Sequence, residues 1–212
     1  MNLKETHQHK VRFHYNLLNI SRREIIEPLV LPAAIITFIG YISYGVILTL
    51  IPDWSEHLGI ANKGSFFIVF TLSSLFVRFT AGKLSDKKGR IIILKYAFAM
   101  LILSLLMIGL AKSVILLMSG SFIYGIAVGL FSPASNAWTA DLSNPDFRGR
   151  AMATMYIALE AGIGIGALLA GIVFHDQYQR IPWIFCGAAF INLIGLTYLI
   201  RLKKTIRVNT ST

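Results

Sequence analysis

The sequence is poor in cysteine and in charge. Among 212 residues there is one cysteine, Cys186, and only 14% are charged, whereas 55% are hydrophobic. A single cysteine excludes an internal disulfide and a metal site built from cysteines. Soluble domains average about 25% charged and about 45–50% apolar residues, so this balance leaves more apolar surface than a soluble domain of this length can bury. The composition therefore indicates a membrane protein.

Acidic residues are also scarce, because 10 of them stand against 20 lysines and arginines, for a net charge of +10. Such a charge is compatible with nucleic-acid binding when the basic residues share one face. Here they lie in short segments between apolar runs. We therefore predict no nucleic-acid partner.

Long apolar runs dominate the chain. A bilayer core of about 30 Å requires about 20 apolar residues in a helix, and continuous runs favour helices over the alternating strands of a barrel. The sequence predicts an all-α membrane protein, a bundle of six transmembrane helices within residues 29–200, with Pro52, Pro133 and Pro182 at span ends. The predicted spans are 29–51, 65–81, 91–111, 114–131, 151–174 and 183–200.

The flanking charges predict the orientation. If the N-terminus is cytoplasmic, the opposite side carries only Lys63, Lys112 and Arg180, while the basic loops and both ends lie inside. We expect a multi-pass protein of the cell membrane with a basic linker at 1–28 and a basic tail at 201–212, both cytoplasmic. The linker is compatible with an amphipathic helix on the anionic leaflet and equally with an unstructured segment. Its histidines lack a cysteine or carboxylate frame, so neither a metal nor a cofactor is expected.

The segment 78–90 contains an ordered set of small and charged residues. Gly82 allows close helix approach, Asp86 and Lys87 follow, and Gly89 provides a turn that brings Arg90 to the start of the next helix. We expect a tight cytoplasmic hairpin loop in which Asp86 pairs with Arg90 or with a neighbouring helix. Contacts that differ between two packings would make this segment a conformational latch. The preference for positive charge inside explains the lysines but not the order Gly, Asp, Gly, Arg.

This segment resembles the Gly-x-x-x-Asp-Arg/Lys-x-Gly-Arg motif that the major facilitator superfamily carries between the second and third helices of each six-helix half. The resemblance implies a fold of two six-helix bundles, of which this chain supplies one, and the function of a secondary active transporter. Because segment 160–171 lacks the Gly-Pro pair of N-terminal halves and segment 145–150 is similar to the loop before the eleventh helix of drug-efflux members, the chain resembles helices seven to twelve. A drug-efflux type implies proton-coupled export.

Glu160 is the one carboxylate predicted near the middle of the membrane, roughly 15 Å deep at 1.5 Å per residue. Reversible protonation would let it couple proton movement to transport. A hydrogen-bonded glutamate that packs against a glycine-rich helix is an equally good interpretation.

Two further groups follow from the pattern. Small residues at Gly125, Gly129, Gly162 and Gly166 predict close helix packing. The resemblance implies that the first and fourth spans line a central cavity, so three tyrosines in these spans are candidate cavity residues. Their rings suit an amphipathic or cationic ligand. Alternatively, each of them serves helix packing. These tyrosines are Tyr41, Tyr44 and Tyr124. Asn136, Trp138 and Asp141 follow Pro133 and are expected in a loop at the membrane interface.

Other functions were weighed against transport. One is a non-transporting membrane protein, either a fragment of an interrupted transporter gene or a partner subunit of a split one. An intramembrane enzyme is not expected, because the spans lack a His-Glu-x-x-His motif, a second carboxylate and a serine beside a base. A six-helix half would leave its cavity side against lipid, so a second six-helix bundle or a homodimer is expected alongside a small-molecule substrate.

Overall fold

The computed structural model describes residues 26–209, with side chains to residue 202, and this part consists of six long helices and three short 3-10 segments. Each long helix is apolar and long enough to span a membrane, which confirms the predicted all-α, multi-pass bundle. Most of the predicted linker lies outside the described residues. The helices are α2 (Leu31–His57), α3 (Ser65–Lys88), α4 (Arg90–Gly109), α5 (Val114–Leu142), α6 (Arg148–Phe174) and α7 (Ile181–Asn209); the 3-10 segments are Pro28–Val30, Pro145–Phe147 and Tyr178–Arg180.

The prediction that Pro52 and Pro133 mark helix ends was wrong. Pro52 lies inside α2 and Pro133 inside α5, and α5 continues to Leu142. A proline removes one backbone donor, which packed neighbours tolerate within a membrane bundle. Beyond Pro133 the helix is held by a buried stripe that includes Trp138, which is only 6% exposed. The segment expected as an interface loop is therefore the last part of α5.

The hairpin between the second and third spans is shorter than predicted. Helix α3 extends through Lys88 and α4 begins at Arg90, so Gly89 alone connects them. The φ angle of Gly89 is +90°, a conformation that a residue without a Cβ adopts at little cost. The reversal of chain direction thus depends on one glycine.

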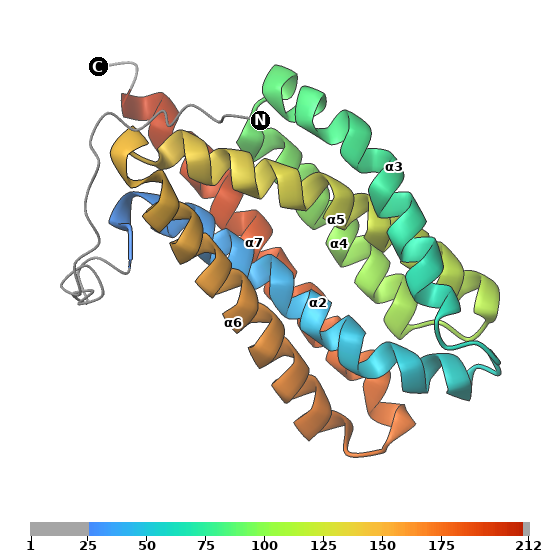
Figure 1. Ribbon diagram of the computed structural model, residues 1–212. Helices are drawn as coiled ribbons and strands as arrows, with labels where there is room; N and C mark the ends of the chain where they lie inside the picture. The colour runs from blue at the N-terminus through green and yellow to red at the C-terminus, as the bar shows by residue number, and fades with distance from the viewer. Residues whose placement is uncertain (1–25, 210–212) are drawn as a thin grey trace, which may run out of the picture.

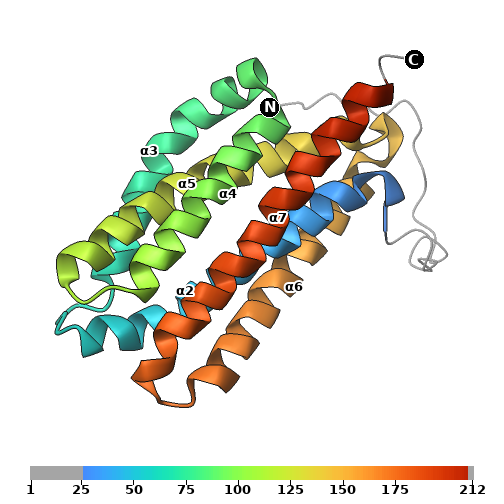
Figure 2. The ribbon, with the colours of Figure 1, turned by 180° about the vertical axis from the view of Figure 1, so that it is seen from behind.

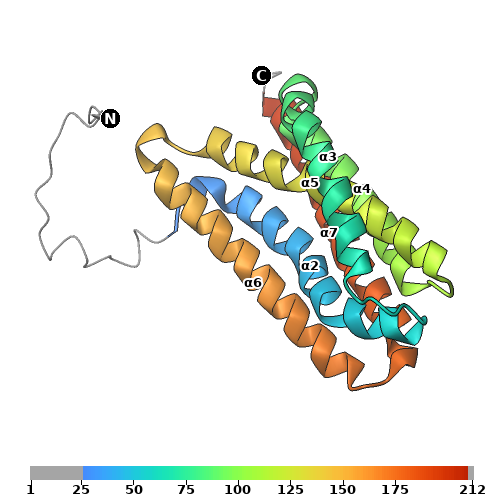
Figure 3. The same ribbon diagram turned by 45° about the vertical axis from the view of Figure 1, so that its right-hand side comes forward.

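The helices form two groups of three, α2 with α6 and α7, and α3 with α4 and α5. Contact between α4 and α7 joins the groups, and these two helices lie side by side when the molecule is seen from behind (Figure 2). If α2, α3 and α4 are exchanged in order for α5, α6 and α7, the pair α2–α6 becomes α5–α3 and the pair α4–α5 becomes α7–α2. This symmetry is expected for an internal structural repeat. Helices α3 and α6 lie at opposite edges of the bundle (Figures 1 and 3).

Helices α2 and α6 touch through their backbones. A Cβ added at Gly162 would lie 2.5 Å from the carbonyl oxygen of Phe38, and one added at Gly166 would lie 2.1 Å from that of Ile42. Glycine is therefore required at both positions for this approach.

The pair α3 and α5 is built in the same way. A Cβ at Gly125 would lie 1.9 Å from the Ser73 hydroxyl, and one at Gly129 would lie 2.7 Å from the carbonyl oxygen of Ser74. The four glycines predicted to serve packing thus lie at the two closest helix contacts that involve the edge helices α3 and α6.

Candidate functional site

A cavity of about 330 Å³ lies among α2, α3, α5 and α6. Tyr44 lies at the middle of the 27-residue α2, and Arg78 lies within the 24-residue α3, five residues before Lys83. Its lining includes Tyr41, Tyr44, Phe70, Ser74, Arg78 and Leu159. The size falls in the range of small-molecule sites, about 300–1,000 Å³.

Aromatic rings form one wall of this cavity. The ring centroids of Tyr41 and Tyr44 are 6.0 Å apart in an edge-to-face arrangement, and those of Tyr44 and Phe70 are also 6.0 Å apart. Tyr41 further contacts Phe131 at 5.6 Å. Such contacts hold the rings in place and present apolar faces together with two hydroxyl groups.

Tyr124, the third tyrosine predicted to face the cavity, lies elsewhere. It is 1% exposed and its ring packs 5.7 Å from that of Phe70, with its hydroxyl 3.4 Å from Ser43 Oγ. It therefore lies behind the aromatic wall and supports Phe70.

Arg78 is a cavity residue that the sequence interpretation missed. It is the one charged side chain among the lining residues of this cavity, and no hydrogen bond or ion pair to it occurs in the described part of the chain. It shares the lining of this cavity with Tyr41. The sequence signal was present, since an arginine inside an apolar run is unusual. It was overlooked because Arg78, although within the predicted span 65–81, was counted as the first residue of the basic segment 78–90.

Glu160 follows the lining residue Leu159 on α6 and is exposed on the surface of this bundle. Among the described side chains, up to residue 202, it has neither an ion-pair nor a hydrogen-bond partner. Like Arg78, it lies near the middle of its helix.

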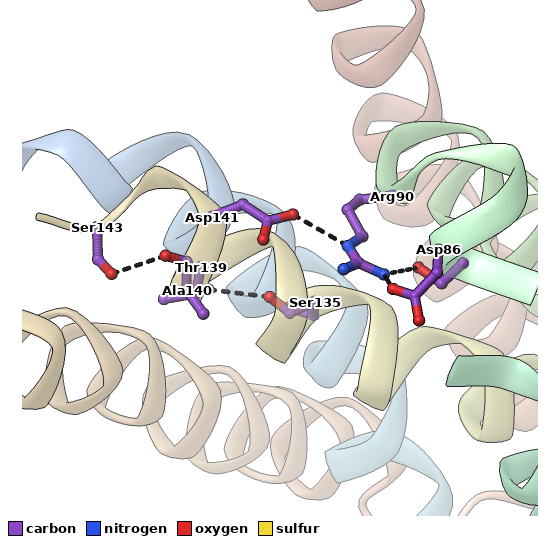
Figure 4. Close-up of polar contacts among 8 residues, drawn as sticks. Asp86, Arg90, Ser135, Thr139, Ala140, Asp141 and Ser143 are labelled. Carbon is purple, nitrogen blue, oxygen red and sulfur yellow. Dashed lines mark hydrogen bonds and ion pairs between the residues drawn. The ribbon is translucent and has the colours of Figure 1, made fainter. Parts of the chain in front are cut away.

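A second site lies at the end of the bundle predicted to be cytoplasmic, where Arg90 joins three helices (Figure 4). Arg90 Nε donates a hydrogen bond to Asp141 Oδ2 at 3.0 Å, while Nη1 contacts the Asp86 carboxylate and donates to Ser85 Oγ at 3.3 Å. The Arg90 side chain is 23% exposed, against 63% for Asp86 and 54% for Asp141. This Arg90 cluster (Ser85, Asp86, Arg90 and Asp141) therefore links the end of α3, the start of α4 and the end of α5.

Two other members of the predicted motif have no contact of this kind. A Cβ added at Gly82 would meet nothing within 4 Å, and Lys87 is exposed. The space beside Gly82 shows that the close approach predicted for it does not involve a described helix of this chain.

A third polar contact fastens the start of α2 to α6. Arg150 Nε donates to Glu27 Oε2 at 2.8 Å, and the Glu27 backbone N–H donates to Thr154 Oγ1 at 2.9 Å. The Glu27 side chain is 5% exposed and that of Arg150 is 24% exposed. Arg150 also lies 4.4 Å from the centroid of the Phe147 ring. Sequence inspection gave no sign of this ion pair, whose partners are 123 residues apart.

Six helices that are apolar and long enough to cross a bilayer define a multi-pass membrane protein. Comparison with known proteins specifies the class: the profile of the Major Facilitator Superfamily matches residues 33–211. The chain belongs to this superfamily of membrane transporters, which confirms the resemblance seen in the motif.

Relatives with curated descriptions are named as drug-resistance proteins. The chain is 25% identical over 169 residues to Multidrug resistance protein 1 of Bacillus subtilis, covering 79% of this chain and 43% of that protein. It is 24% identical over 167 residues to the Quinolone resistance protein NorA of Staphylococcus aureus, covering 76% and 43%. The chain thus spans less than half the length of these relatives.

A solved structure supports the fold. The human organic anion transporter MFSD10 superposes with a TM-score of 0.63 at 20% identity, covering 84% of this chain and 46% of that one. At this identity the likeness concerns the fold. It agrees with a six-helix half of a two-bundle transporter.

Proposed function

We propose that the chain forms one half, the C-terminal one, of a secondary active transporter that exports a small amphipathic molecule in exchange for protons. The observation that carries the proposal is the cavity among α2, α3, α5 and α6, whose aromatic wall and charged residue come from α2 and α3. Secondary transporters bind substrate near the midplane between two bundles. The names of the relatives, multidrug and quinolone resistance proteins, favour export.

The exposed apolar surfaces of the edge helices α3 and α6 favour a second bundle as partner. Large apolar side chains project from the edge helices, among them Phe76 and Phe79 of α3, which are 79% and 76% exposed, and Leu168 of α6, which is 62% exposed. In a bilayer such residues contact either lipid or another helix. The space beside Gly82 on α3 suits a closely approaching helix, which a second six-helix bundle or a second copy of this chain would provide.

Alternating access requires contacts that exist in one packing and not in the other. The Arg90 cluster is suited to this role because its two carboxylates are more than half exposed and lie on different helices. If Arg90 loses its contact with one carboxylate, the contact with the other remains. The free-energy cost of moving the helices between two packings is therefore small. We propose that this cluster is the latch anticipated from the motif and that it faces the cytoplasm.

Proton coupling is assigned to Glu160. A carboxylate in an apolar helix, without a partner among the described residues, is suited to carry a proton in the transport cycle. Glu160 directly follows the cavity-lining Leu159 on α6.

Dye efflux tests the proposal. Everted membrane vesicles containing the chain alone, or the chain with an N-terminal six-helix half of an efflux member, are energised with a pH gradient, and uptake of a fluorescent amphipathic dye is followed. Uptake on co-expression alone supports a transporter half, and uptake by the chain alone supports a homodimer. Vesicles that take up no dye in either state, despite normal insertion, would favour the alternative of a non-transporting fragment or subunit.

A further inference from the structure

The charge in the cavity defines a class of ligand more closely than its aromatic wall does. We propose that Arg78 and Tyr41 form an anion-binding subsite, so that the molecule held in this cavity is an aromatic or amphipathic acid rather than a cation. The proposal rests on the proposed function, since it names the substrate class of the same site.

The first step is the position of the guanidinium. Arg78 lies in the apolar part of α3, and its side chain is exposed on the surface of the described bundle. A charged side chain inside an apolar span is costly unless it is paired or hydrated within a cavity. Arginine does not lose its proton in proteins, so neutralisation cannot relieve this cost. The described chain offers it no carboxylate within ion-pair distance, although it lines a cavity large enough for a small molecule. A negatively charged group in the cavity would supply the missing partner.

The second step is the surroundings of that guanidinium. Tyr41 lines the same cavity as Arg78, and a tyrosine hydroxyl can donate a hydrogen bond to an anion that the guanidinium binds. Ser74, one turn before Arg78 on the same helix, adds a second hydroxyl to the lining. A planar guanidinium beside hydroxyl donors matches the two oxygens of a carboxylate.

The third step concerns the other end of the ligand. Tyr44 and Phe70 present ring faces to the same cavity, which suits an aromatic ring attached to the acidic group. A cationic ring compound would fit the same wall but would bring its charge close to Arg78. The aromatic wall by itself allows either sign of charge, and Arg78 decides between them.

Binding of two probes of opposite charge tests the subsite. The purified chain in phosphatidylcholine nanodiscs is dialysed to equilibrium against protein-free nanodiscs with 1-naphthoate or with 1-naphthylmethylammonium, which share the ring system and differ in charge. We expect naphthoate to bind about ten- to a hundredfold more tightly, the range for hydrogen bonds to charged groups. Arg78→Gln should remove most of this preference, and Arg78→Lys should keep part of it because the charge remains while the planar fork is lost.

Lys83→Gln provides the matched control, because Lys83 lies on the same helix, is exposed and does not line the cavity. It should bind both probes as the parent chain does. Four results would each overturn the subsite. They are equal affinities of the parent chain for the two probes, tighter binding of the ammonium, binding of neither probe, and an Arg78→Gln variant that keeps the full preference for naphthoate. Because the assay measures binding, a chain that binds naphthoate but moves no dye refutes only the proposed transport. A chain that moves dye without charge preference in binding refutes only the subsite.

Discussion

Arg90 Nε donates a hydrogen bond to Asp141 Oδ2 at 3.0 Å and so connects the first residue of α4 with the end of α5, 51 residues later in the chain. The same guanidinium contacts Asp86 in the last turn of α3. One arginine thus carries the contacts that unite three helices at one end of the bundle. A change at either acid alters this end without touching the cavity.

Asp86→Asn and Asp141→Asn test whether the Arg90 cluster controls conformation. An exposed ion pair contributes about 0.2–1 kcal/mol, so loss of one should shift the balance between two packings by up to about fivefold. We expect a changed rate of dye efflux in the assembled transporter, with normal membrane insertion. Asp146→Asn, an exposed acid outside the cluster, is the control. Unchanged efflux in both cluster variants would leave the cluster a structural feature only.

Gly166→Ala tests the contact between α2 and α6. The added methyl group would lie 2.1 Å from the Ile42 carbonyl oxygen, and overpacking of this kind costs about 1–3 kcal/mol. Thermal unfolding in detergent should therefore begin several degrees lower. Gly164→Ala, two residues earlier on the same helix, meets nothing within 4 Å and should unfold as the parent chain does. Equal stability of the two variants would contradict the backbone contact.

Gly82→Val separates assembly from folding. The space around Gly82 is open within this chain, so the variant should insert and unfold like the parent chain. If a second bundle packs closely against α3 here, co-purification of the two halves and dye efflux should both fall. Normal assembly of the variant would show that the partner does not approach at this glycine.

Glu27→Gln tests the buried ion pair at the start of α2. Removal of one partner from a buried pair costs up to about 3–5 kcal/mol, and the partial exposure of Arg150 reduces the expected loss to about 1–3 kcal/mol. The unfolding temperature should fall by several degrees. Glu56→Gln, which removes the partner of Lys63 in an exposed pair, should change it little. A larger fall in unfolding temperature for Glu56→Gln than for Glu27→Gln would contradict the prediction that the buried pair stabilises the fold more than the exposed one.

Glu160→Gln tests proton coupling. The amide cannot exchange a proton, so dye efflux should lose its dependence on the pH gradient while dye binding to the chain persists. Efflux is measured in vesicles with and without the gradient. A variant that still responds to the gradient as the parent does would remove Glu160 from the coupling mechanism.

The apolar runs determined the number and type of the membrane helices, because a segment inside hydrocarbon satisfies its backbone polar groups only as a helix or a closed barrel. The order of residues from Gly82 to Arg90 determined the superfamily. Both conclusions depend on local patterns that a single sequence displays, and the structure and the comparisons confirmed them. The helix ends were less certain, since Pro52 and Pro133 looked like boundaries until the packed neighbours of α2 and α5 were known.

Tertiary structure alone decided which distant residues meet. Asp141 became a partner of Arg90 only because α5 continues past Pro133 and lies beside α4, and Glu27 met Arg150 only because α6 packs on α2. Tyr124 and Tyr41 look alike in sequence, yet one lies behind the aromatic wall and the other lines the cavity. Which face of a helix is covered depends on the crossing of neighbouring helices, and composition carries no information about it when every face is apolar.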